Sequence, residues 1–216
     1  MVIIMLVVEV GFKLDNELKY YEEILNKSNA INRFNCKTHD IYWTNKNLDN
    51  MTENEMKNAC IRLRITEGFG GTDFKGSKIK KFFKIKNKES YRFQNINDFI
   101  VPSDNQKELT LEDVNNYILK IESNGYKKVF DTFKIDYQYS IGDMKSRIQL
   151  QDIKDVGLLL YYDNPDYYEM SLEEQRNKLI DELNSYGFNF KYSDLGLDKL
   201  RTLYYHEEKF SKNQNG

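Results

Sequence analysis

The chain has 216 residues, of which 40% are hydrophobic and 31% are charged. This composition is typical of a soluble globular protein, and the length suits one sizeable domain. The formal net charge of −2 excludes the broad positive field of a non-specific nucleic-acid binder. Any site for a polyanion must therefore come from local clustering of lysine and arginine.

The cysteine content and the N-terminal segment indicate where the protein works. Cys36 and Cys60 are too few for a disulfide framework or a zinc site, so we expect two free thiols in a reducing compartment. The apolar segment 1–8 is too short to cross a bilayer, and it lacks the basic start and cleavage site of a signal peptide. We therefore expect a cytoplasmic protein with no membrane partner.

The first predicted strand covers residues 7–14, VVEVGFKL. Its apolar residues alternate with Glu9, Gly11 and Lys13, and side chains two positions apart on a strand share a face. We expect the apolar residues in a core and these three residues on the opposite face. A carboxylate and an ammonium side by side suit a metal ion and a phosphate together.

An amphipathic helix over 15–28 follows, and then a strand over 34–45. Residues 50–59 are polar and predict a turn or a short helix.

The next strand, CIRLRIT at 60–66, points Arg62 and Arg64 away from its apolar face. The glycine-rich segment 67–78 is expected to be a mobile loop, because it lacks the lysine that follows in a phosphate-binding loop. A hairpin is predicted over 80–96. Its polar positions are Lys84, Lys86, Arg92 and Gln94.

The remainder of the chain alternates helices with single strands. Helices are predicted over 109–126 and 171–188, the second with Ser171 as its cap and Gly187 as its stop. Strands are predicted over 128–140, 146–153 and 156–163, followed by a closing helix over 193–205 and a frayed tail over 209–216. The polar strand positions here are Lys134, Asp136, Gln138, Arg147, Gln149 and Gln151. Strands without βαβ alternation predict an α+β protein with an antiparallel sheet that can close into a barrel. One domain is expected over 1–208.

The order of these motifs resembles the CYTH family, which includes class IV adenylyl cyclases, thiamine triphosphatases and other triphosphate tunnel metalloenzymes. Glu9, Gly11 and Lys13 match its E-x-E-x-K signature except at Gly11. The strand 34–45, with Asp40, Tyr42 and Trp43, resembles the family segment that ends in D-x-Y-F/W-D, and CIRLRIT matches its R-x-R strand. The segment 148–163 resembles the strand pair that ends in E-I-E. The resemblance implies a closed or nearly closed eight-stranded antiparallel barrel with helices outside and a triphosphate in its lumen.

The resemblance also implies two sets of site residues. The metal ligands for Mg²⁺ or Mn²⁺ would be Glu9 and Asp163. The phosphate-binding residues would be Lys13, Arg62, Arg64, Lys84, Lys86, Arg92, Lys134 and Arg147.

Acidic positions of the family pattern are mostly missing, whereas basic positions are kept. The family carboxylates are replaced at Gly11, Gln94, Ile96, Gln151 and Tyr161. Asp136 is a substitute in a new place. Because phosphoryl transfer depends on metal electrostatics, losing carboxylates costs rate more than affinity.

The sequence therefore favours a tunnel protein that binds a nucleotide or another polyphosphate with weakened or lost turnover, as a sequestering or sensing pseudoenzyme. The alternative is an active metal-dependent adenylyl cyclase or triphosphatase that cleaves a nucleoside triphosphate, thiamine triphosphate or tripolyphosphate. An RNA 5′ end is a less favoured ligand, and the sequence leaves a homodimer open.

Two further features have ordinary explanations. His39 and His206 lack neighbours at ligand spacing, so surface or hydrogen-bonded histidines are expected. The aromatic residues around Pro165 suit stacking on a base, although core packing or a dimer surface is the commoner role. They are Tyr161, Tyr162, Tyr167 and Tyr168, to which Trp43 can be added.

Overall fold

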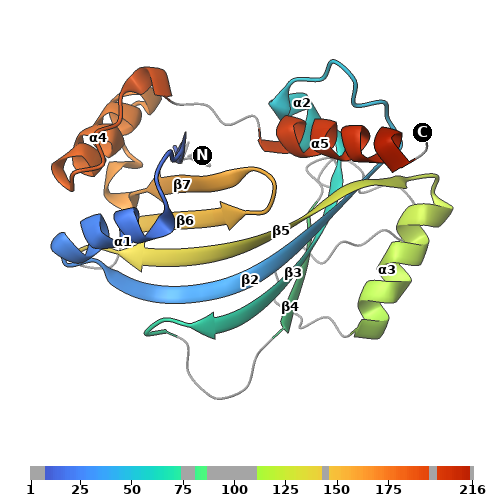
Figure 1. The fold of residues 1–216 in the computed structure, drawn as a ribbon, viewed down its shortest axis with the longest axis horizontal. Coiled ribbons are helices and arrows are strands. Elements are labelled where there is room, and N and C mark those ends of the chain that lie inside the picture. The colour runs from blue at the N-terminus through green and yellow to red at the C-terminus, as the bar shows by residue number, and fades with distance from the viewer. Residues whose placement is uncertain (1–7, 74–80, 87–110, 143–145, 195–198, 215–216) are drawn as a thin grey trace, which may run out of the picture. The chain divides into compact units, whose positions relative to one another are not determined.

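The computed structural model describes residues 8–73, 81–86, 111–142, 146–194 and 199–214 (Figure 1). Contacts divide the chain into two compact units. Unit 1 consists of Met1–Lys37, Gly68–Lys78 and Lys134–Leu197, and unit 2 of Thr38–Glu67, Ile79–Phe133 and Asp198–Gly216. The single domain expected over 1–208 stays a prediction.

The described residues form seven strands and five α-helices. The strands are β1 (Val10–Lys13), β2 (Ile31–Thr44), β3 (Ile61–Gly70), β4 (Lys81–Lys86), β5 (Lys127–Ser140), β6 (Arg147–Ile153) and β7 (Gly157–Asp163). The helices are α1 (Leu18–Lys27), α2 (Glu53–Ala59), α3 (Leu111–Ser123), α4 (Leu172–Ser185) and α5 (Lys199–Gln214).

The strands form one sheet in the order β1-β7-β6-β5-β2-β3-β4. The pairs β1–β7, β7–β6, β6–β5 and β3–β4 are antiparallel. The α+β class with an antiparallel sheet is therefore confirmed. Among the described residues β1 and β4 are the two ends of the order, so this sheet is not closed and the eight-stranded barrel is not confirmed. The predicted second arm of the hairpin, 90–96, lies outside the described residues.

The core of unit 1 lies between one face of β1, β6 and β7 and the helices α1 and α4. Phe12, Leu150 and Leu160 are opposite one another across the three strands and are completely buried. Leu25 of α1 and Leu183 of α4 pack onto this face. The alternation expected for 7–14 is thus realised: one face of β1 is apolar, and the other is left for polar residues.

The core of unit 2 contains Trp43, Ile61, Leu63 and Ile121. Elsewhere in this unit α2 packs on α5. The Glu53 carboxylate accepts hydrogen bonds from the first backbone N–H groups of α5, at 2.8 and 3.1 Å, which satisfies donors that a helix start leaves open.

The start of α4 follows the sequence signals. The Ser171 hydroxyl accepts from the N–H of Glu174, and the Glu174 carboxylate accepts from the N–H of Ser171, which makes a capping box. Gly187, predicted as the stop, has a φ of 102°, which favours glycine. α2 begins with a second capping box, between Thr52 and Glu55.

Two segments are more regular than predicted. The first residues of the expected loop 67–78 continue β3 to Gly70. After that strand, Thr72 and Asp73 donate backbone hydrogen bonds to β2, and a Cβ on Gly71 would lie 2.4 Å from the Arg33 carbonyl oxygen. Glycine is therefore needed at position 71 for close approach of two backbones.

The closing helix also extends beyond its predicted end. α5 continues to Gln214, through most of the residues that were expected to form the frayed tail 209–216. Across the part of the chain that is described, no helix has the length and hydrophobicity needed to span a membrane.

Candidate functional site

The strand register of unit 1 gathers the predicted polar residues on the sheet face opposite its core. We call the polar face the set of unit 1 residues whose side chains lie there. Its polar residues, together with Gly11, are Glu9, Lys13, Lys134, Asp136, Gln138, Arg147, Gln149, Gln151, Tyr161 and Asp163. The buried Leu159 of β7 also lies on this face, opposite Lys13 on one side and Gln151 on the other. Because these residues alternate with core residues along each strand, the sequence pattern predicted this face correctly.

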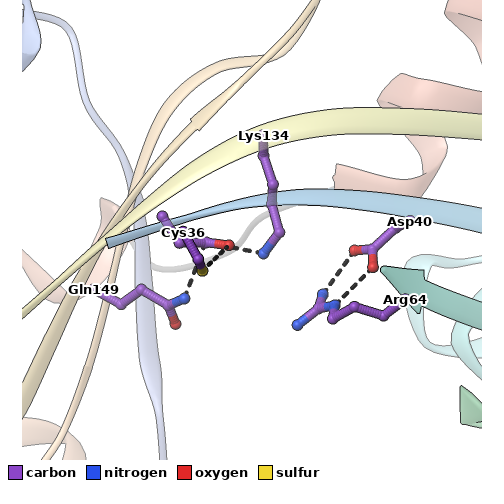
Figure 2. Close-up of polar contacts among 6 residues, drawn as sticks. Cys36, Asp40, Arg64, Lys134 and Gln149 are labelled. Carbon is purple, nitrogen blue, oxygen red and sulfur yellow. Dashed lines mark hydrogen bonds and ion pairs between the residues drawn. The ribbon is translucent and has the colours of Figure 1, made fainter. Parts of the chain in front are cut away.

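Asp136 is the centre of a buried hydrogen-bond network on this face, and Figure 2 labels its partners Lys134, Gln149 and Cys36. The Lys134 Nζ and the Gln149 Nε2 each donate to Asp136 Oδ1 at 3.0 Å. The Cys36 thiol lies 3.8 Å from Oδ2, a weak hydrogen bond. The side chains of Lys134 and Asp136 are 0% and 2% exposed, so this ion pair is almost completely removed from water.

Arg147 is the centre of a second and more exposed network. Its Nε donates to Asp163 Oδ1 at 3.0 Å, and its guanidinium lies 3.5 Å from the Glu9 carboxylate. Tyr168 donates to the other oxygen of Asp163 at 3.0 Å. Burial raises the pKa of Tyr168, and the hydrogen bond to Asp163 raises it further. The Arg147 side chain is 52% exposed, so water reaches one part of the guanidinium.

These networks bear on the predicted metal site. Mg²⁺ and Mn²⁺ need carboxylate or other oxygen ligands. Glu9 and Asp163 share the Arg147 guanidinium, and Asp136 already accepts from a lysine, an amide and a thiol. In the described parts of the chain, no three acidic, histidine or cysteine residues come together as a metal site. The residues as arranged do not fit a metal ion, and the ligand role of Glu9 and Asp163 stays a prediction.

Gln151 presents an unpaired hydrogen-bonding group to the polar face. It lies opposite Asp136 in the ladder and is 6% exposed. Its Oε1 is buried and accepts no hydrogen bond from any described residue. A buried acceptor without a donor costs free energy, and eight other buried side-chain atoms of the described residues are in the same condition.

Unit 2 holds the predicted arginine strand. Arg64 binds the Asp40 carboxylate through Nε and a terminal nitrogen at 2.6 and 2.7 Å, and Asp40 is 0% exposed (Figure 2). Arg62 is half-buried and contacts Tyr42, whose pKa burial raises to about 12. The register places Lys86 opposite Arg62 and Lys84 opposite Arg64.

The structure thus distributes the predicted phosphate-binding residues over two units. Lys13, Lys134 and Arg147 lie in unit 1, and Arg62, Arg64, Lys84 and Lys86 lie in unit 2. Arg92 lies outside the described residues, as do Gln94 and Ile96. Their common role in one lumen stays a prediction.

The sequence did not predict the hydrogen bonds that Asp40 and Cys36 make. The motif around Asp40 was recognised as family-like, but pairing with Arg64 depends on the neighbouring strand. Cys36 was expected to be one of two free thiols, and both cysteines are indeed free and buried. His39 is hydrogen-bonded to Asp131 at 3.1 Å, as expected for an ordinary histidine.

No family model and no curated protein matches this chain. Solved structures do match. A protein of Pyrococcus horikoshii OT3 has a TM-score of 0.52 at 13% identity, covering 92% of this chain and 99% of the other. A conserved hypothetical protein of Pyrococcus furiosus has a TM-score of 0.51 at 17% identity, covering 88% and 94%. A putative adenylate cyclase of Vibrio parahaemolyticus has a TM-score of 0.51 at 12% identity, covering 88% and 92%.

At this level of identity the comparisons show the fold. The chain shares its α+β fold with a protein described as a putative adenylate cyclase. This agrees with the CYTH-like fold that the motifs predicted.

Proposed function

We propose that this protein binds a nucleotide or another polyphosphate as a divergent CYTH-like protein whose turnover is weakened or lost. One observation carries the proposal: each carboxylate of the polar face is paired with a cation of the protein itself. Glu9 and Asp163 are paired with Arg147, and Asp136 is paired with Lys134.

This pairing supports the loss of turnover. Phosphoryl and nucleotidyl transfer rely on metal ions that are held by carboxylates beside the phosphates. A divalent ion would have to displace Arg147 from Glu9 and Asp163, or Lys134 from Asp136. The glutamine at position 151 adds no negative charge to compensate.

Phosphate binding is supported by cations that water can reach. Lys13 is exposed, and Arg147 is half-exposed with five N–H donors, of which the two carboxylates use only part. Arginine binds phosphate well because its planar group presents several donors together. Lys134 is buried against Asp136, so we assign it the role of holding Asp136 in place.

In unit 2, Arg62 is the better candidate to bind an anion, because Arg64 already makes two hydrogen bonds to the buried Asp40 carboxylate. Lys84 and Lys86 lie opposite the two arginines in the ladder. A lumen that joins both sets, with an eighth strand, remains part of the proposal and rests on the sequence. The shared fold with a putative adenylate cyclase supports a nucleotide as one ligand class.

A thermal-shift screen tests the proposal. ATP, tripolyphosphate and cyclic AMP are added to the purified chain in EDTA, in Mg²⁺ and in Mn²⁺, and products are followed by anion-exchange chromatography. We expect ATP or tripolyphosphate to stabilise the protein in EDTA. In the samples with Mg²⁺ or Mn²⁺, we expect no phosphate, pyrophosphate or cyclic AMP to be formed. Stabilisation that requires metal and is accompanied by product would show an active enzyme instead.

Matched lysine variants test the location. Lys13→Ala should lower the stabilisation by tripolyphosphate, whereas Lys154→Ala, which removes an exposed lysine from the β6–β7 turn, should not. In unit 2, Arg62→Ala tests the half-buried arginine, and Lys127→Ala, at an exposed lysine, is its control. Equal effects within each pair would contradict the assignment.

A further inference from the structure

The unit 1 sheet carries adjoining apolar side chains on the face opposite the polar face. Tyr137 lies opposite the core residue Leu150 in the β5–β6 ladder, so it points away from the polar face. The Phe69 ring meets the Tyr137 ring edge-on, with 6.5 Å between the ring centroids, and therefore lies on the same side. Ile135, two residues before Tyr137 on β5, also shares this side. We call Phe69, Ile135 and Tyr137 the apolar patch.

Water reaches the apolar patch. Phe69 is 42% exposed, and Ile135 and Tyr137 are half-buried. Where one face of an antiparallel sheet meets water, its residues are normally polar. Here the exposed residues of the sheet include apolar ones, whereas Lys134 and Asp136 on the polar face are almost completely buried. Apolar side chains that adjoin one another at a surface mark interaction sites, in contrast to single exposed ones.

The β6 side of the apolar patch is acidic. Asp152 of β6 lies directly opposite Ile135 and is exposed. Burial raises the pKa of Tyr137, and the negative charges of Asp152 and of Glu22 in α1 raise it further. Both carboxylates are therefore close enough to the apolar patch for their charge to act on it.

The β2 side of the apolar patch carries a cation. β2 is the neighbour of β5 on the side away from β6. Cys36 of β2 contacts Asp136 on the polar face, so the next residue, Lys37, points to the side of the apolar patch. Lys37 is exposed. The patch thus has opposite charges on its two flanks, with β5 between them.

We infer that the apolar patch is the contact surface of a homodimer, in which Lys37 of each copy meets Asp152 of the other. A two-fold contact brings the same surface of two copies together. With the axis parallel to β5, the β2 side of one copy faces the β6 side of the second copy, and both ion pairs form at once. A partner with one sign of charge would be repelled by one flank, whereas a second copy matches both.

The apolar residues then meet in the middle of the contact, where interfaces are most apolar, and the charges lie at its rim. This inference goes beyond the proposed function and does not depend on it.

Sedimentation velocity at several protein concentrations tests the inference. We expect a species of twice the 25.8 kDa chain mass at about 100 μM, where a dimer with a micromolar Kd is mostly assembled. Phe69→Glu should raise the Kd by about tenfold or more, because it places a carboxylate in the apolar middle of the contact. Leu119→Glu, at an apolar residue of α3 that is 64% exposed, is the control and should leave the Kd unchanged. Circular dichroism checks that each variant is folded.

Charge reversal tests the arrangement independently of Phe69. Lys37→Glu and Asp152→Lys should each weaken the dimer, because like charges then face one another. The double variant should recover most of the affinity, since both ion pairs form again with their signs exchanged. Both residues are exposed, so the fold should tolerate these changes, and Lys178→Glu, at an exposed lysine of α4, is the control.

Three results would overturn the inference. The first is a monomer at every concentration, and the second is an assembly that grows beyond two copies, because a two-fold contact closes at a dimer. The third is a dimer that Phe69→Glu leaves intact. A double variant that dimerises no better than either single variant would likewise refute the pairing of Lys37 with Asp152.

Discussion

The Lys134 ammonium lies 3.0 Å from the Asp136 carboxylate, and both side chains are buried in unit 1. A buried ion pair loses the hydration of two charges, so its net effect on stability is small, but removing one partner leaves the other uncompensated. The pair therefore makes each residue dependent on the other.

The first prediction concerns this dependence. Lys134→Met should lower the free energy of unfolding by about 3–5 kcal/mol, because Asp136 is left buried without its cation. The double change Lys134→Met with Asp136→Leu should recover most of that loss. Urea denaturation followed by circular dichroism measures both. Lys154→Met, at an exposed lysine, is the control and should change stability by no more than about 0.5 kcal/mol. Additive losses in the double variant would contradict the pairing.

The second prediction separates Arg64 from Arg62. Asp40 is 0% exposed and accepts both short hydrogen bonds from Arg64. Arg64→Ala should therefore destabilise the protein by about 3 kcal/mol. Arg64→Lys should recover only part, because lysine lacks the bidentate geometry.

Arg62→Ala is the matched variant in the same strand, and we expect it to cost less stability than Arg64→Ala. Urea denaturation of the three variants gives the comparison. The result also decides how ligand tests are designed, because a loss of binding in Arg64→Ala would be confounded with a loss of folded protein. If Arg62→Ala is the more destabilising change, the role of Asp40 is not as described.

The two arginines also show what the sequence made predictable. Alternation along 7–14 and 60–66 placed polar and apolar residues on the correct faces, since a strand has a period of two. Helix ends at Ser171 and Gly187 followed local capping chemistry, which needs no knowledge of the remainder of the fold.

Pairing across strands was not predictable in the same way. Arg62 and Arg64 have equivalent positions in the pattern, yet only the neighbouring strand decides that Arg64 binds Asp40. Lys134 was expected to bind phosphate. Its burial against Asp136 depends on the two strands beside β5, which supply the other donors to Asp136, Cys36 and Gln149. The continuation of β3 to Gly70 likewise depends on tertiary contacts: glycines predict a loop, but Gly71 serves a close approach to Arg33.

The third prediction is a pH effect at Asp131. Burial acts to raise its pKa, but hydrogen bonds from Lys128 and His39 outweigh burial and hold the pKa below the ordinary value. A carboxyl group whose folded pKa is lowered stabilises the fold above the ordinary pKa of about 3.9, and that contribution is lost as the pH falls through the folded value.

Removing a donor should reverse the shift. In Lys128→Met, the Asp131 carboxyl resonance should titrate at a higher pH than in the unchanged protein, as followed by carbon-detected NMR. Lys127→Met removes the adjacent exposed lysine and is the control. An unchanged Asp131 titration in Lys128→Met would contradict the contribution of Lys128.

The fourth prediction uses the reactivity of Cys60, a buried residue of unit 2. Burial raises the pKa of its thiol to about 12. Thiolate is the reactive form, and at pH 8 only about one thiol in ten thousand would be ionised at that pKa, compared with roughly a quarter for a free cysteine. We therefore expect Cys60 to resist iodoacetamide in the folded protein at pH 8 and to react rapidly in urea. Peptide mass spectrometry distinguishes Cys60 from Cys36, and a Cys36→Ala variant confirms that the signal belongs to Cys60. Rapid alkylation of Cys60 in the folded protein, with circular dichroism unchanged, would mean that this part of unit 2 opens readily, because a buried protonated thiol can react only when the surrounding strand and helix expose it.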